Sequence, residues 1–408
     1  MATLSGQTIA NTFDSLLHVE DDTAGLVATS TDSRVIQDGV GAASALALAT
    51  DSVRITSTNK LYFNDVGGEY ISGDGHQALS ALTQGDHNIA IGSGAMATTD
   101  TAGKNIAIGY QASQALVGGT DGCVAIGYQA LIGDVNAAHY TIAIGQQALL
   151  ALTSGSGNTA VGYIAGKLLT TGSDNTIFGY AAMDATVVGA AENVAIGQDA
   201  MGGSHTGTLS QKNVAIGKEA MGTGAMNAAN NNTAVGYQSL KVVTTGSQNV
   251  AIGALAGDAL TDGADNTFVG RHSGSLTASV QHAVCVGNNA GGSGAMTTAA
   301  IGTVAVGSNA LGEQTEGVGN VAVGYQTLDA ITTGDYNTAV GHKALSAAQT
   351  ANAGSNTAMG YTVGFSLTSG TDNVYMGRDA GYYNATGSNN TFVGKSAGQT
   401  ENGENNSN

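Results

Sequence analysis

The residue types that usually carry metal chemistry are few in this 408-residue chain and form no recognisable constellation. Metal sites commonly draw on histidines a few residues apart or on closely spaced pairs of cysteines. None of the eight histidines belongs to a His-x-His or His-x-x-x-His pair. The two cysteines, Cys123 and Cys285, lie far apart in the chain. We therefore predict no metal site, no cofactor and no disulfide framework, and a structural role for both cysteines.

Catalytic patterns are equally weak. A nucleophile, a base and an orienting acid can be chosen from any serine-rich chain, so their presence alone decides nothing. No suitable glycine run leads into the Lys-Ser/Thr pair of a phosphate-binding loop. Gly-x-Asp-Asn turns, as at 172–175, do not form the tandem glycine–aspartate array that binds calcium. We predict that the protein is not an enzyme.

One aromatic pattern could serve recognition. A tyrosine directly follows a recurrent glycine at Tyr110, Tyr128, Tyr163, Tyr180, Tyr237, Tyr325 and Tyr361. A row of tyrosines on the surface could contact the face of a sugar, because aromatic rings offer rigid amphipathic area. The same row could instead cover the edge of the fold or a neighbouring chain. We favour this second interpretation because tyrosine packs at interfaces routinely.

Composition limits the kind of element that can position these residues. The chain has 62 Gly, no Pro and no Trp, and only 10% of its residues are charged, while 42% are hydrophobic. This is too apolar for a disordered chain, and the glycines lack the strict period of collagen. The formal net charge of -18 argues against a nucleic-acid partner. No segment resembles a secretory signal or is long and apolar enough to span a membrane.

The dominant feature is an internal repeat that reads Asn-[Thr/Val/Ile]-Ala-[Ile/Val]-Gly, with another Ala three residues after the Gly. Clear copies run from Asn88 to Gly92, Asn105 to Gly109, Asn213 to Gly217, Asn249 to Gly253, Asn320 to Gly324 and Asn390 to Gly394. Eighteen copies follow one another at steps of 17 or 18 residues, with 19 or 20 at four places. A constant period with small insertions indicates stacked coils with variable loops.

Each repeat predicts one coil of an all-β solenoid. The motif is as long as a short strand, and β-branched residues flank its central Ala. Turn-forming residues such as Gly246-Ser247-Gln248 precede it, and the motif Gly ends it where a side chain would not fit. We expect a second short strand to begin near the next Ala. Asparagine opens fourteen of the eighteen copies, and stacked amides can form a hydrogen-bonded ladder. A row of ligand-binding amides is the alternative, but Asn alone is a weak metal ligand.

The strand alternation carries a prediction about assembly. The two β-branched residues share one strand face and the Ala lies on the other, so both faces are apolar. A narrow coil can enclose only one of them. The small Ala would allow a second copy to approach closely, so we expect an oligomer about a long axis.

The repeat resembles the head repeats of YadA-like trimeric autotransporter adhesins, and similar repeats occur in tail-fibre and appendage proteins of tailed bacteriophages. This resemblance covers about residues 86–398 and implies a left-handed parallel β-roll built as a homotrimer. The period is longer than in the adhesins. We also expect neither a signal peptide nor a stalk and anchor, and those features belong to an autotransporter. A virion fibre assembled in the host cytoplasm needs none of them.

Three parts are therefore predicted: residues 1–85 as an attachment region that binds other virion proteins, 86–398 as the β-roll, and 399–408 as a polar tail. The run 60–75 resembles segments of phage tail and appendage proteins. The leading hypothesis is a bacteriophage fibre or appendage protein, exposed on the virion, that binds a glycan or protein on the host surface. The alternatives are a trimeric adhesin head on a bacterial surface and, third, a tailspike-type polysaccharide depolymerase.

Overall fold

The computed structural model divides the chain into two units, Met1–Tyr62 and Phe63–Asn408. It describes residues 18–19, 36–37, 87–98, 101–117, 119–133, 135–136, 138–186, 189–204, 210–347 and 353–399. In the first unit, β1 (His18–Val19) pairs antiparallel with β2 (Ile36–Gln37). The rest of the predicted attachment region up to residue 86, and the tail from residue 400, lie outside the described residues.

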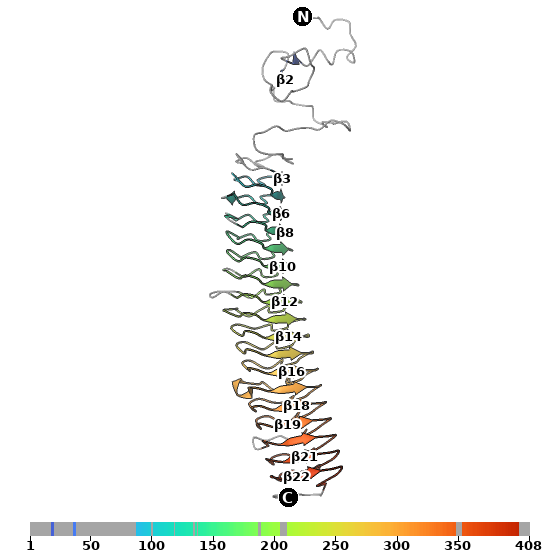
Figure 1. Ribbon diagram of the computed structural model, residues 1–408. Helices are drawn as coiled ribbons and strands as arrows, with labels where there is room; N and C mark the ends of the chain where they lie inside the picture. The colour runs from blue at the N-terminus through green and yellow to red at the C-terminus, as the bar shows by residue number, and fades with distance from the viewer. Residues whose placement is uncertain are drawn as a thin grey trace, which may run out of the picture. The chain divides into compact units, whose positions relative to one another are not determined.

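The second unit confirms the predicted parallel β-solenoid. Within its described residues, each copy of the motif contributes one strand of three residues to a single ladder (Figure 1). The strands are β3 (Ile89–Ile91), β4 (Ile106–Ile108), β6 (Val124–Ile126), β8 (Ile142–Ile144), β9 (Thr159–Val161), β10 (Thr176–Phe178), β11 (Val194–Ile196), β12 (Val214–Ile216), β13 (Thr233–Val235), β14 (Val250–Ile252), β15 (Thr267–Val269), β16 (Val284–Val286), β17 (Val304–Val306), β18 (Val321–Val323), β19 (Thr338–Val340), β20 (Thr357–Met359), β21 (Val374–Met376) and β22 (Thr391–Val393).

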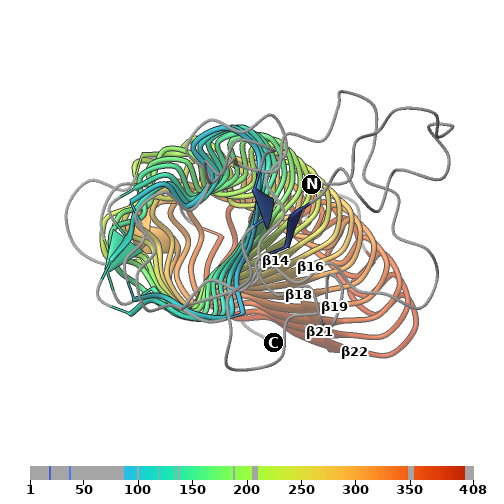
Figure 2. The same cartoon turned by 90° about the horizontal axis from the view of Figure 1, so that it is seen from above.

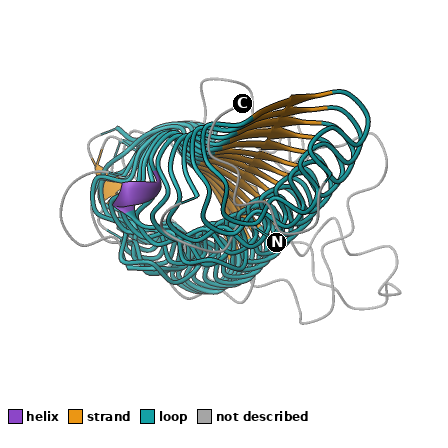
Figure 3. Cartoon of the chain, turned by 90° about the horizontal axis from the view of Figure 1, so that it is seen from below, coloured by secondary structure: helices purple, strands orange, loops and turns teal. Residues whose placement is uncertain are grey.

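All pairings in this ladder are parallel and join like positions of successive coils. In the pairing of β12 with β13, for example, Ala215 lies beside Ala234. Seen along the stack, the coils superpose and their strands fan out gradually (Figures 2 and 3). The fan follows from the twist between neighbouring strands. Identical residues consequently form columns along the solenoid.

The prediction of a second strand after the motif glycine was wrong for nearly every described coil. The return segment consists of turns, and on that side the described residues form only one short pair, β5 (Leu116–Val117) with β7 (Val135–Asn136). Residues two and four places after the glycine adopt left-handed backbone angles, as in Gln111 (φ 54°) and Ser113 (φ 46°). Their N–H groups donate along the stack, Gln111 to Ser93 O and Ser113 to Ala130 O, both at 2.9 Å. Turns therefore connect the coils by hydrogen bonds here without extended geometry.

The coils differ mainly in their loops. The coil between β16 and β17 is one of the longest and contains the 3-10 helix η1 (Thr298–Ala300), whose first turn is capped by the Thr297 hydroxyl. Because such insertions lie outside the paired strand, they leave the ladder register unchanged.

The core lies inside the coils, between the strand and the return turns. The central strand residue is buried, as in Ala215 and Ala251, and it packs against Leu and Met side chains of the turns, such as Met221 and Leu240. Our inference that the Ala face would lie toward another chain was therefore wrong. The interior is narrow and holds mostly alanines with a few larger side chains, as in the coil that begins with β12, which buries Ala215, Ala220, Met221, Met226 and Ala229. The β-branched residues point outward.

Candidate functional site

The asparagines that open the motif form a buried ladder. Asn88, Asn105, Asn213, Asn249, Asn320 and Asn390 are all at most 1% exposed. Asn249 shows the repeated geometry: its backbone N–H and its Nδ2 both donate to Asn232 Oδ1 at 3.0 Å, and Nδ2 also donates to Gly263 O at 2.9 Å. Except in Asn390, whose Oδ1 has no hydrogen-bond partner, the amide oxygen of each of these side chains accepts from the following coil. The Asn249 Nδ2 donates twice, and all six side chains are buried, so the role of the asparagines is to connect the coils.

The motif glycines connect the coils in a second way, through the close approach of their backbones. Gly92, Gly109, Gly217, Gly253 and Gly324 have φ between 121° and 140°. A Cβ on Gly217 would lie 2.5 Å from Gly236 O, and the others meet the next motif glycine in the same manner. Gly394, in the last described coil, has the same backbone angle, yet a Cβ there would meet nothing within 4 Å.

Several members of the tyrosine row form stacked rings on the surface. Tyr110 and Tyr128 stack with ring centroids 5.3 Å apart, and Tyr163 stacks on Tyr180 at 5.1 Å. All the predicted members are exposed: Tyr110, Tyr128, Tyr163, Tyr180, Tyr237, Tyr325 and Tyr361. Because stacked rings cover one another's faces, a sugar could lie flat only on a ring at the end of a stack. Where a ring face is covered by its neighbour, the ring offers a ligand only its edge and its hydroxyl group.

The longest stack includes a residue that the tyrosine pattern does not reveal. The His342 ring lies 5.2 Å from both Tyr325 and Tyr361, and the Arg378 guanidinium lies 6.0 Å from the Tyr361 ring centroid. His342 and Arg378 occupy the same place after a motif glycine as the tyrosines do. Alignment of the repeats by position, without regard to residue type, would have found both. The result is a ridge over four coils that ends in a cation.

The outer face of the strands is an extended apolar surface. The third residue of each ladder strand is Ile, Val, Phe or Met in every coil. Many of these residues are exposed, including Phe178, Ile252 and Met359, and Val393 reaches 64% exposure. The first residue of each strand is Ile, Val or Thr and faces the same way. Along the ladder this makes an apolar strip about 85 Å long and about 7 Å wide, or roughly 600 Å².

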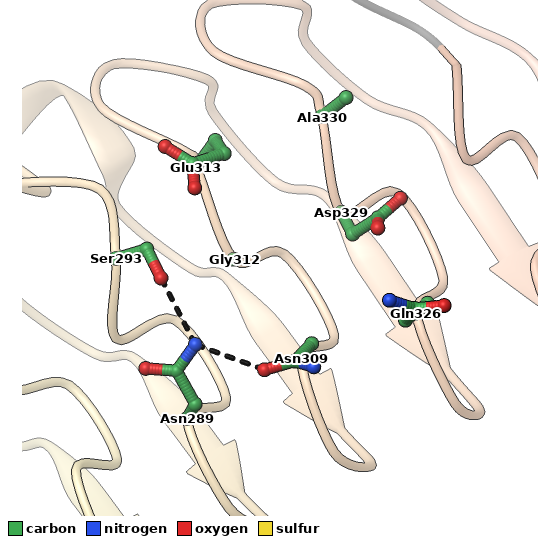
Figure 4. Close-up of a pocket in the computed structure, with 8 residues that line it drawn as sticks. All are labelled: Asn289, Ser293, Asn309, Gly312, Glu313, Gln326, Asp329 and Ala330. Atoms are coloured by element: carbon green, nitrogen blue, oxygen red, sulfur yellow. Dashed lines mark hydrogen bonds between the residues drawn. The ribbon is translucent and has the colours of Figure 1, made fainter.

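A polar recess lies on the return side of the coils (Figure 4). It is lined by Asn289, Ser293, Asn309, Gly312, Glu313, Gln326, Asp329 and Ala330. Asn289 Nδ2 donates to Ser293 Oγ and to Asn309 Oδ1, both at 2.9 Å. Burial raises the pKa of the Asp329 carboxyl, which lies at one wall. Hydroxyl groups of a ligand would find both donors and acceptors here.

Burial is the main cause of a raised pKa in four other groups. The Cys285 thiol is fully enclosed, and burial raises its pKa to about 12. The pKa of Cys123 is raised for the same reason. Burial also raises the pKa of Asp184 and Asp258, which stand at the same place in their coils as Asp329. Thiols held protonated in this way are poor nucleophiles.

Within the described residues, no three His, Cys, Asp or Glu side chains gather as metal ligands. No helix among those residues is long and apolar enough to cross a bilayer. The chain matches no model of a known protein family, no curated protein and no solved structure.

Proposed function

We propose that this protein is a structural fibre or appendage protein of a tailed bacteriophage, a homotrimer exposed on the virion that attaches the particle to its host. The observation that carries this proposal is the unbroken apolar column on the outer strand face. Exposed apolar patches of a soluble protein seldom exceed a few hundred Å², and larger ones mark interaction sites. Because the strip is apolar in every coil, it suits a partner whose apolar residues repeat at the same spacing along the axis. A second copy of this chain is such a partner.

The corrected position of the core strengthens the reason for self-association. The coil interior is filled by Ala, Leu and Met without help from another chain. The β-branched outer face therefore forms the proposed contact, with the strands of each copy directed toward a common axis. Three copies are proposed because of the likeness of the repeat to trimeric β-rolls. The tyrosine ridge and the polar recess remain available on other parts of the coil for a glycan or protein of the host.

Light scattering on the purified chain tests the assembly and should give a mass of three times 40.2 kDa. Electron microscopy should show rods whose repeat section is about 85 Å long. Ile252→Glu places a charge on the outer strand face, where Ile252 is 42% exposed, and should convert the trimer to smaller species. Lys218→Glu, on an exposed position outside that face, is the matched control. A well-folded monomer of the unaltered chain would refute the burial argument.

A trimeric adhesin head on a bacterial surface is the second candidate, because the same repeat and the same apolar column would serve it. Immunogold labelling decides between the two: the proposal expects label on purified phage particles and none on uninfected cells. Label confined to the bacterial surface would establish the adhesin instead. The binding of other virion proteins by residues 1–85 is part of the proposal and predicts that a chain without them folds but is missing from assembled particles.

Absence of catalysis also remains a prediction. A depolymerase would release reducing sugar from host polysaccharide, and we expect none. Binding without release, measured on the same polysaccharide, would agree with an attachment role.

A further inference from the structure

The longest aromatic stack on the surface has one end whose ring face is not covered by another ring. His342 covers one face of Tyr325, with the ring centroids 5.2 Å apart. On the other side, Ser308 occupies the equivalent place of the preceding coil, and its short side chain carries no ring. At the opposite end of the stack, the Arg378 guanidinium lies 6.0 Å from the ring centroid of Tyr361. Tyr325, which is 46% exposed, therefore offers an open aromatic face toward the coil of Ser308.

The polar recess lies at the level of the same coils. Asn309 and Gln326 line it, and these residues directly follow Ser308 and Tyr325 in the chain (Figure 4). Because successive Cα atoms are about 3.8 Å apart, a ligand of two sugar rings could reach both the open face and the recess. The recess has a volume of about 320 Å³, near the lower end of the range for small-molecule sites.

The recess presents both donors and acceptors to a ligand. Ser293 Oγ and Asn309 Oδ1 both accept from Asn289 Nδ2 at 2.9 Å, so the Ser293 hydroxyl proton and the Asn309 Nδ2 are left to donate. The acceptors are the carboxylates of Glu313 and Asp329, neither of which forms an ion pair within the part of the chain that the structure describes. A sugar hydroxyl both donates and accepts, so it can bind a donor and an acceptor of this kind together.

We infer that this place binds a neutral saccharide, with one sugar ring stacked on the open face of Tyr325 and hydroxyl groups of the next ring bound in the recess. An aromatic face supplies rigid apolar area for the C–H groups of a sugar ring. The Glu313 and Asp329 carboxylates and the net charge of -18 disfavour an acidic saccharide. The inference rests on the proposed attachment to a host, since it names the ligand class that this attachment would use. The recess lies on the return side of the coils, so the proposed contact between copies through the strand face leaves it accessible.

Tyr237 has an equally exposed ring, but the polar groups beside it are already paired. It is 47% exposed, against 46% for Tyr325. The next residue, Gln238, donates from its Nε2 to Glu219 Oε2 at 2.7 Å, and Lys241 Nζ lies 3.3 Å from the same oxygen. Tyr237 is therefore the matched control for a sugar site that needs both a ring and a recess.

An array of neutral and acidic oligosaccharides, probed with the purified full-length protein, tests the ligand class. We expect binding to neutral oligosaccharides. If the protein binds no neutral oligosaccharide, or binds acidic ones alone, the inference is overturned.

Calorimetric titration with the neutral oligosaccharide that binds best tests the place. Tyr325→Ala should weaken binding by about tenfold because it removes the aromatic face, whereas Tyr325→Phe should retain the affinity. Tyr237→Ala, the control, should bind as the unaltered chain does. An equal loss for both alanine variants would show that the sugar binds along the tyrosine row in general and would overturn the assignment to Tyr325 and the recess.

A second pair of variants tests the recess itself. Glu313 and Glu316 are both exposed and lie in the same loop, and of the two Glu313 lines the recess. Glu313→Ala should weaken binding by about tenfold, because hydrogen bonds to a charged acceptor are the stronger kind, and Glu316→Ala should leave it unchanged. Equal affinities of these two variants would overturn the role of the recess. These measurements are independent of the virion: absence of sugar binding would leave the label expected on phage particles unaffected, and sugar binding with label confined to the bacterial surface would refute the phage proposal while this site stands.

Discussion

The substitution Gly217→Ala tests two physical reasons why the motif requires glycine at this position, the backbone angle and the close approach of the next coil. Gly217 has a φ of 134°, a region that an L-residue occupies at a cost of about 1–3 kcal/mol. In addition, its new Cβ would lie 2.5 Å from Gly236 O and 2.7 Å from Gly236 C. These are backbone atoms of a hydrogen-bonded coil, so they cannot rotate away as a side chain would. Overpacking of this kind adds about 1–3 kcal/mol. We expect Gly217→Ala to destabilise each chain by about 2–6 kcal/mol.

Gly394→Ala is the matched control. Its φ of 126° gives nearly the same backbone penalty, but there is no atom within 4 Å for the Cβ to meet. Thermal and denaturant unfolding should therefore show a much larger loss for Gly217→Ala. Hydrogen exchange should place that loss in β12 and β13, on both sides of the collision. Equal losses would show that backbone strain alone selects glycine, and an unchanged melt for Gly217→Ala would refute the close coil-to-coil approach.

Three further outcomes follow from the buried groups. Asn249→Ala removes one ladder amide and leaves Asn232 Oδ1 short of one donor, so it should lower the unfolding free energy by about 1–3 kcal/mol. The control Lys218→Ala should lower it by less than about 0.5 kcal/mol. Equal effects of the two variants in denaturant unfolding would contradict the ladder. Burial raises the pKa of Asp329, so in the folded chain its carboxyl keeps its proton to a higher pH than in the unfolded chain. The contribution of this group to stability therefore falls as the pH rises from the ordinary pKa of the unfolded chain through the raised pKa of the folded chain. Asp329→Asn should therefore stabilise the chain at neutral pH and lose that advantage in acid, and a denaturant series at several pH values that shows no such convergence would disprove the assignment. Cys285 should resist alkylation at pH 8 until the chain is unfolded, and mass spectrometry of a native sample that shows rapid labelling would contradict its burial.

The fold could be predicted from the sequence because one physical unit repeats. Periodicity located every ladder strand, and the turn residues before Asn249 and the glycine after it marked where each strand begins and ends. In-register stacking then followed, because identical coils bury most surface when like residues align. The buried asparagine ladder could be expected from the same reasoning, since an amide can donate and accept along one column.

The return side of the coil was not predictable in the same way. Its residues with left-handed angles, such as Gln111 and Ser113, are of types with no propensity for them, and such angles cost non-glycine residues about 1–2 kcal/mol each. These angles exist because hydrogen bonds between neighbouring coils stabilise them, as in the bond from Gln111 N to Ser93 O. That energy is a property of the stack and cannot be read from one repeat. The same holds for the direction of the Ala face, which depends on the space inside the coil.

The interior shows how the repeats keep that space constant. Where the central strand residue is a large aromatic ring, the residues that pack against it from the turns are glycines. Phe268 lies between Gly257 and Gly274, and a Cβ on either glycine would come within 2.7 Å of its ring. Gly364 and Gly381 stand in the same relation to Tyr375, so both large rings fit into the narrow coil.

This compensation reaches from one coil to the next, since Gly257 belongs to the turns of the coil before Phe268. A repeat with Phe in its strand therefore cannot be moved elsewhere in the stack without its preceding neighbour. Although the motif looks interchangeable, the order of the coils is fixed by packing between adjacent ones. The outer face is free of this constraint, because its residues make no contact across the interior. Its apolar character in every coil is therefore not explained by packing in the interior, and the proposed contact between copies would explain it.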